Sequence, residues 1–220
     1  MKRIFSAVLF LFACFSLHAQ PKVELSLTGS PSLSWMRSDA KEVKKGQAIL
    51  GYDFGINADF YFMQSDKYSI GTGFLITGSG GELQYQTNDD FTFAGENLEP
   101  YTKVKYHTRY IEIPAVIKMK TSQFHRTTFW GQFGLSNMIN IGDKGTSNDR
   151  VLDKTDINDE VHLFNMALNV GMGFEFDLGG NNAITTGLVF KNGFFDVTSN
   201  SGISDKTIMN TLKLKLGIVF

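Results

Sequence analysis

The sequence has 220 residues, with 21 Lys and Arg against 22 Asp and Glu, and a formal net charge of −1. This balance excludes the basic surface that nucleic-acid binding requires, so no nucleic-acid partner is expected. The single cysteine excludes a disulfide framework, while 22 glycines, 20 phenylalanines and four prolines favour strands with tight turns over disorder.

The first residues have the layout of a secretory signal peptide. Two basic residues precede an apolar run over 4–17, which is shorter than the roughly 20 residues that a spanning helix needs. We expect cleavage after Ala19, so that 1–19 is a signal peptide and 20–220 is a single β-barrel domain. The alternative is lipidation at Cys14, because the residues around it faintly resemble a lipoprotein box.

After residue 22, apolar and polar residues alternate with a period of two, which is typical of strands with two different faces. The pattern is clearest over 50–63, over 163–176 and in the final segment of the chain. A break in the first strand is expected at Pro31. In chain order the predicted strands are 23–36, 50–63, 68–79, 107–119, 127–137, 163–176, 183–194 and 211–220.

The connections between these strands alternate between short and long. Bacterial outer-membrane barrels show this asymmetry, with short periplasmic turns and long extracellular loops. The sequence therefore predicts an all-β protein, an eight-stranded antiparallel up-and-down transmembrane β-barrel located in the outer membrane with lipid around it. The short connections are 64–67, 120–126 and 177–182, and the long ones are 37–47, 80–106, 138–161 and 195–206.

A soluble exported ligand-binding barrel is the alternative, since it has the same alternation with the two faces inverted. The glycines decide against it, because they share the polar face, where a narrow lumen needs small residues. We therefore expect the bulky apolar face to meet lipid, with aromatic girdles at its two edges. The girdle residues are Tyr52, Phe62, Tyr68, Phe129, Phe164, Phe176 and Phe220.

The polar face also carries four acids and four bases, which we expect to point into the lumen. Charges withdrawn from water are tolerated when they are paired and hydrogen-bonded. The sequence therefore predicts a side-chain-filled lumen that is plugged by ion pairs and is not an open channel. The eight residues are Asp53, Asp59, Glu112, Lys118, Glu175, Lys191, Lys213 and Lys215.

One strand carries the motif Tyr110-Ile111-Glu112-Ile113-Pro114, and a glycine-rich strand over 169–175 follows it. Together with the Ala19-Gln20 processing site and the last strand, these residues resemble the PorT-like outer-membrane barrels of Bacteroidetes. The resemblance implies an outer-membrane location and an eight-stranded barrel of the OmpX/OmpA type. The terminal Phe220 resembles the signal that the barrel assembly machinery reads. Pro114 has no amide hydrogen, so we expect a local bulge or bend there.

The only candidate for a catalytic site lies at the predicted outer rim, where the sequence places His107 and His162. Asp159 and Glu160 are close to His162 in the sequence. A base near acids is what a membrane-barrel protease or lipid acyltransferase would need, and such an enzyme is the alternative function. We expect no enzyme, no cofactor and no metal site, since the acidic residues of 148–160 lack the spacing of a calcium-binding loop.

The long loops 80–106 and 138–161 are the expected contact surfaces for a protein or glycan partner, because a rigid barrel commonly presents its binding residues on loops. Loop 80–106 is either a mobile loop or an outward extension of its two strands as a hairpin. The leading hypothesis is therefore a non-enzymatic outer-membrane barrel with a structural or partner-binding role.

Overall fold

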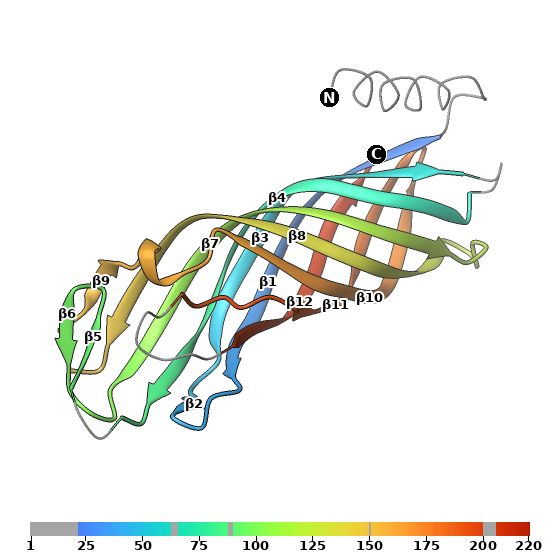
Figure 1. The fold of residues 1–220 in the computed structure, drawn as a ribbon. Helices are drawn as coiled ribbons and strands as arrows, with labels where there is room; N and C mark the ends of the chain where they lie inside the picture. Colours follow the sequence, from blue (N-terminus) through green and yellow to red (C-terminus); the bar gives the residue numbers. More distant parts are fainter. Residues whose placement is uncertain (1–21, 63–65, 88–89, 150, 200–205) are drawn as a thin grey trace, which may run out of the picture.

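The computed structural model describes residues 22–62, 66–87, 90–149, 151–199 and 206–220 (Figure 1). The signal peptide over 1–19, with Cys14 and the cleavage site at Ala19, lies outside these residues. Eight long strands form the barrel: β1 (Val23–Ser38), β3 (Ile49–Tyr61), β4 (Tyr68–Tyr85), β7 (Lys103–Lys120), β8 (Thr127–Ser147), β10 (Phe164–Gly179), β11 (Asn182–Gly193) and β12 (Thr207–Val219).

Every neighbouring pair of these eight strands is antiparallel, and the sheet closes where β12 pairs with β1. Closure leaves no barrel strand with a row of unpaired backbone groups, and hydrocarbon would make such a row very unfavourable. The start of β1 and the end of β12 lie at the same end as the short turns (Figure 1). We call this end the short-turn end and the opposite one the long-loop end. The predicted fold class is confirmed.

At the long-loop end, β4, β7 and β8 are longer than predicted, so 80–106 and 138–161 are largely strand and not loop. Of the two interpretations of 80–106, the outward extension is confirmed. Shorter elements complete this end: β2 (Val43–Lys45), β5 (Phe91–Phe93), β6 (Glu96–Leu98), β9 (Asp153–Asp156) and the 3₁₀ helix η2 (Asn158–Glu160). β2 pairs with β4, β9 with β8, and β5 with β6.

The two prolines inside strands leave the register unchanged. β1 runs unbroken past Pro31, so the break expected there is wrong, although the ladder to β12 has no pairs between Thr28 and Ser32. Pro114 likewise interrupts the ladder to β4 without shifting it. The bulge expected at Pro114 lies instead between Arg109 and Tyr110, on the β8 side. A missing amide hydrogen removes a ladder bond, and neighbouring bonds on the same strand hold the register.

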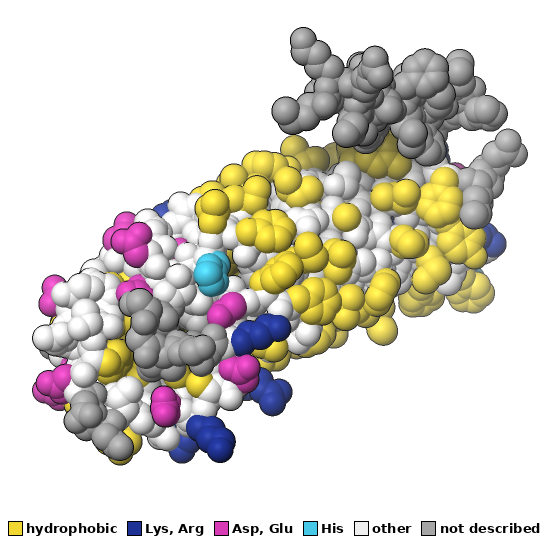
Figure 2. Space-filling model, viewed as in Figure 1, with side chains coloured by type: hydrophobic (Ala, Val, Ile, Leu, Met, Phe, Trp, Pro, Cys, Tyr) yellow, Lys and Arg dark blue, Asp and Glu magenta, His cyan; other side chains and the backbone are white. Residues whose placement is uncertain are grey.

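One face of the strands carries apolar side chains that point away from the barrel axis and form an exposed belt (Figure 2). Monomers that live in water rarely expose so large an apolar surface. The alternative of a soluble barrel with an apolar interior is therefore wrong. Of the seven predicted girdle residues, six are exposed, and Phe62 is half-buried against Tyr68. Strongly exposed belt residues include Leu50, Phe54, Ile56, Ile70, Phe74, Phe133, Met172, Leu188 and Ile218.

The interior changes character along the barrel axis. Near the short-turn end it is polar, as predicted, and small residues such as Ser26 and Gly71 make room for charged side chains. Toward the long-loop end it becomes an apolar core, which the sequence analysis did not predict. That core contains Met36, Val43, Leu83, Tyr85, Phe93, Leu98, Val104, Tyr106, Tyr110, Met138, Leu152, Ile157, Val161, Ala167, Val197 and Met209.

Candidate functional site

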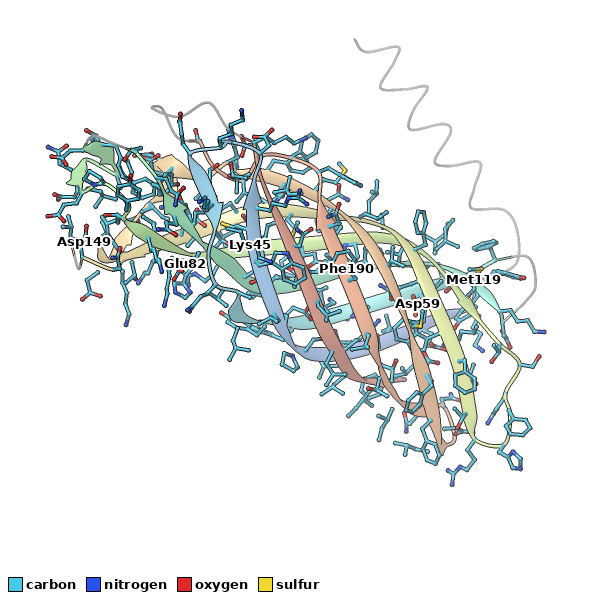
Figure 3. The ribbon with its side chains drawn as sticks, turned by 90° about the horizontal axis from the view of Figure 1, so that it is seen from below. Lys45, Asp59, Glu82, Met119, Asp149 and Phe190 are labelled. Atoms are coloured by element: carbon cyan, nitrogen blue, oxygen red, sulfur yellow. The ribbon has the colours of Figure 1, made fainter. Side chains whose placement is uncertain are left out.

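The polar half of the lumen begins with an ion-pair cluster near the short-turn end. The Lys118 ammonium lies 2.7 Å from the Asp59 carboxylate and 3.0 Å from that of Glu175. Lys120 lies 2.5 Å from both Glu175 and Glu24, so five side chains from four strands form one alternating network. Figure 3 places Asp59 inside the barrel wall. Each charge has an opposite partner, which is the condition for keeping charges in an interior.

A second cluster lies further along the axis around Glu112, which is fully buried. Its carboxylate accepts hydrogen bonds from Lys191 at 2.5 Å, Thr77 at 2.9 Å and Ser136 at 2.8 Å. A separate pair joins Lys213 to the Asp53 carboxylate at 2.7 Å.

Amide side chains extend the Glu112 cluster across the lumen. Asn169 donates to Ser136 at 2.9 Å, and Gln132 donates to Asn169 at 2.7 Å. Seven of the eight predicted lumen charges are thus paired as expected.

Lys215 is the exception among the predicted lumen residues. It forms no ion pair with a carboxylate in the described part of the chain, and its ammonium lies 5.2 Å from the ring centroid of Trp130. The Lys118 ammonium lies 5.7 Å from the same ring, so one indole contacts two cations. Aromatic rings attract cations through their negative faces. The sequence analysis missed Trp130 in this role.

Two members of the network were also missed, Glu24 and Lys120. Both lie at the extreme ends of their strands, and the predicted strand containing Lys118 ended at residue 119. The signal was present, because Glu24 has the same parity as the serines of β1, and Lys120 the same parity as Lys118. With these two included, five acids and five bases share the lumen.

These side chains leave little free space. The cavity between Asp59, Glu112 and Lys213 has a volume of about 20 Å³, which is the scale of a single water molecule. An eight-stranded barrel is only just wide enough for its side chains. At this level the described side chains fill and brace the barrel, and the cavity between them is too small for a ligand much larger than water.

The motif residues fall on both faces of β7. Tyr110, Glu112 and Pro114 point into the lumen, whereas Ile113 is exposed on the apolar belt and Ile111 is half-buried beside it. The motif therefore contributes side chains both to the lumen and to the apolar belt. Its Glu112 is the carboxylate at the centre of the second cluster.

Beyond the belt, the long-loop end forms what we call the cap, which comprises the described residues within 39–48, 82–107, 143–162 and 194–206. Its strands and connections bury apolar side chains together. Phe93 lies edge-on to Tyr106 at 5.9 Å between ring centroids, and the hydroxyls of Tyr85 and Tyr106 are hydrogen-bonded. Leu98 and Leu152, from two different connections, are fully buried in the same core.

Polar contacts join the connections of the cap to one another. The Ala94 amide donates to the Glu160 carboxylate at 2.9 Å, and the Lys206 amide donates to Asp39 at 2.8 Å. These bonds link segments that are far apart in the sequence. The long connections 80–106 and 138–161 are therefore parts of one packed structure.

Asp149 organises one turn of the cap, and Figure 3 shows it at the far tip, beyond Glu82. Burial opposes ionisation of its carboxyl, but hydrogen bonds from Ser147, Val151 and Thr102 outweigh burial and hold the pKa of Asp149 below its usual value.

The histidines proposed for a rim enzyme do not come together with acids. His107 is exposed on the outer face of β7, opposite Lys144, and no ion pair joins His107 or His162 to a carboxylate within the described ranges. Glu160 instead accepts the bond from Ala94. No group of three potential metal-binding side chains of the His, Cys, Asp and Glu types occurs among the described residues.

The last strand, β12, ends at Val219. The amide of Phe220, which follows it, donates to the Leu25 carbonyl at 2.8 Å, and the Phe220 ring is exposed at the short-turn edge of the belt. In the described part of the chain, helices long and apolar enough to cross a bilayer are absent.

An exposed apolar belt, a closed antiparallel sheet and a charged, filled lumen define an outer-membrane β-barrel protein. The family comparison agrees with this class. Residues 18–199 match the model of the outer membrane protein beta-barrel domain, so the chain belongs to that family and is located in the outer membrane. In such barrels the short turns are periplasmic and the long loops extracellular.

Several solved structures are similar to this chain. Neisserial surface protein A is 12% identical, with a TM-score of 0.47, over 89% of this chain and 95% of that one. The attachment invasion locus protein Ail of Yersinia pestis is 14% identical, with a TM-score of 0.43, over 90% and 99%. The outer membrane protease OmpT from Escherichia coli is 10% identical, with a TM-score of 0.45, over 93% and 98%. No curated protein sequence matches the chain.

Proposed function

We propose that the chain is a non-enzymatic outer-membrane barrel that holds a folded platform outside the cell and docks a protein or glycan partner on it. The observation that carries the proposal is the common core of the cap, into which four separate connections bury apolar side chains. Ordered loops bind with a smaller entropic penalty than mobile ones, so a packed cap suits recognition. The small volume of the lumen cavity beside Glu112 supports a role at the surface and not in transport.

The backbone of the cap supports the same proposal. Ala94, Tyr101 and Lys154 all have positive φ values, at 50°, 65° and 53°. Non-glycine residues in this conformation are held there by their surroundings, and they concentrate at functional sites. Tyr101 also exposes about half of its side chain near the tip, and exposed tyrosines are enriched in protein interfaces.

Three finer features belong to this proposal. The chain is a PorT-like member of its family, as its Tyr110–Pro114 motif suggests. It is exported by a signal peptide that is cleaved after Ala19, without lipidation at Cys14. The barrel assembly machinery recognises its last strand through Phe220. N-terminal sequencing of the protein purified from membranes tests the cleavage site, because lipidation would leave Cys14 as the blocked first residue.

Site-specific photo-crosslinking in intact cells tests partner docking. A photoreactive amino acid replaces Tyr101 in the cap, and matched controls carry it at Gln123, in a short turn, and at Ile117, on the belt. We expect a discrete adduct from Tyr101 that neither control gives. An absent adduct at Tyr101, or the same adduct at Gln123, would contradict the proposal.

The rival proposal, an enzyme with a rim site, makes a separate prediction. Purified, folded protein would cleave peptides or deacylate or acylate lipids, and His162→Ala would abolish that activity. We expect no such activity in either protein, and a turnover that depends on His162 would overturn the non-enzymatic proposal.

A further inference from the structure

A hollow of about 280 Å³ lies on the outside of the barrel, where the apolar belt meets the cap. On its floor, β4 carries Gly78 at an outward position, whereas Phe74 occupies an outward position nearer the short-turn end. The ring of Tyr52 lies over Gly78, where an added Cβ would come within 2.7 Å of it. One wall is apolar, because Leu50 lines the hollow with 84% of its surface exposed.

The opposite wall is cationic. On β7 the outward residues change from Ile113 on the belt to Arg109 and His107, and on β8 they change from Ile141 to Lys144. The register brings these positions together, since Arg109 pairs with Gly78 on one side, and His107 pairs with Lys144 on the other.

The Arg109 guanidinium extends beside Gly142 of β8, which has no side chain to displace it. Positive charges of Lys105 and Lys154 also act on His107. The hollow is therefore lined by the basic side chains of Arg109 and Lys144 and by His107, at the edge of the belt.

Three acids lie near the hollow: Glu82, Asp156 and the buried Asp143, on which the charge of Arg109 acts. Glu82 lies 3.8 Å from Lys105 and is covered by the segment around Gly46. Asp156 faces Lys144 across the β8–β9 ladder, but neither Lys144 nor Arg109 forms an ion pair with a carboxylate of the described residues.

We propose that this hollow binds the phosphorylated headgroup of a glycolipid in the outer leaflet, with Arg109 and Lys144 contacting phosphate and Leu50 contacting the start of an acyl chain. Arginine matches phosphate with two parallel hydrogen bonds, and lysine adds a point charge. The volume lies near the lower limit of small-ligand sites, about 300 Å³, so it fits a headgroup and not a whole lipid. A charged surface that only faces water would not be expected to combine Arg109 and Lys144 with an exposed apolar side chain such as Leu50.

Native mass spectrometry of the detergent-solubilised protein, titrated with diphosphorylated lipid A, tests this site. The variant R109A/K144A removes two charges at the hollow, and the control R126A/K67A removes two exposed charges at the short-turn end. We expect at least a tenfold weaker affinity for lipid A in R109A/K144A and less than a twofold change in the control. Equal weakening in both, or no change in R109A/K144A, would overturn the proposal.

Two further binding measurements test whether the ligand is a phosphorylated lipid. Lipid A stripped of its phosphates is expected to bind the wild-type protein at least tenfold more weakly, and inorganic phosphate at an equal phosphate concentration is expected not to displace lipid A. Displacement by inorganic phosphate would show an anion site without lipid specificity and overturn the lipid assignment. If R109A/K144A fails to fold, K144A alone is tested, with an expected loss of threefold or more, and an unchanged affinity there contradicts the site.

Discussion

Removing the negative charge of Glu112 is expected to destabilise the barrel more than any change on its surface. Glu112 is fully buried and accepts bonds from Lys191, Thr77 and Ser136. Glu112→Gln keeps the shape and an acceptor oxygen for one hydroxyl, but it leaves the Lys191 ammonium without its counter-charge. Breaking a buried ion pair in this way costs about 3–5 kcal/mol, so the free energy of unfolding should fall by that amount.

A double substitution separates the unpaired charge from general damage. In E112Q/K191M the buried ammonium is also gone, and replacing both partners of a buried pair is often neutral, so stability should return to within about 1 kcal/mol of wild type. Glu96→Gln, at an exposed position of β6, is the control, with an expected change below about 0.5 kcal/mol.

Urea unfolding in lipid vesicles, followed by the fluorescence of Trp35 and Trp130, measures all four proteins. The reasoning fails if Glu112→Gln is as stable as wild type, or if the double variant is no more stable than the single one. Either result would mean that water or other side chains neutralise Lys191 in the folded barrel.

Three other predictions concern packing, backbone and pH. Gly187→Ala should reduce the free energy of unfolding by about 1–3 kcal/mol in the same urea assay, because its Cβ would come within 2.5 Å of the Trp130 ring. Ala94→Asn should make the cap about 1 kcal/mol more stable by hydrogen exchange, since asparagine accepts the positive φ of the Ala94-Gly95 turn more readily than alanine. The pKa of Asp149 is depressed, so its stabilisation is present above its unfolded-state pKa and is lost as the pH falls through the folded-state pKa. Wild-type cap should therefore lose protease resistance in acid, and Asp149→Asn should show a smaller difference between neutral and acidic pH; equal differences would contradict this role.

The faces of the strands were predictable because successive side chains of a strand point to opposite sides. Asp53 and Asp59 fall on the same face of their strand as its glycines, and Phe54 and Phe60 fall on the other face. If the phenylalanines face lipid, the two aspartates must point into the lumen. The errors lie where a strand end had to be located. Lys120 was missed for that reason, and the strand extensions into the cap were partly taken as loops.

The partners within the lumen were not predictable from the pattern. Lys118 meets Asp59 and Glu175 because three strands are staggered so that these positions reach one level. A shift of one strand by two residues would preserve every face and change every partner. The unpaired position of Lys215 beside Trp130 has the same origin.

The sequence by itself determined the strand segments, their alternating faces and the direction of the apolar belt, because these depend on local geometry that repeats every two residues. The tertiary structure alone decided which charges pair, where the interior changes from polar to apolar, and that Phe93, Leu98 and Leu152 form one core. The same holds for the hollow beside Arg109. These features depend on the stagger of the closed sheet and on the packing of connections that have no periodic pattern, so they exist only when distant parts of the chain meet.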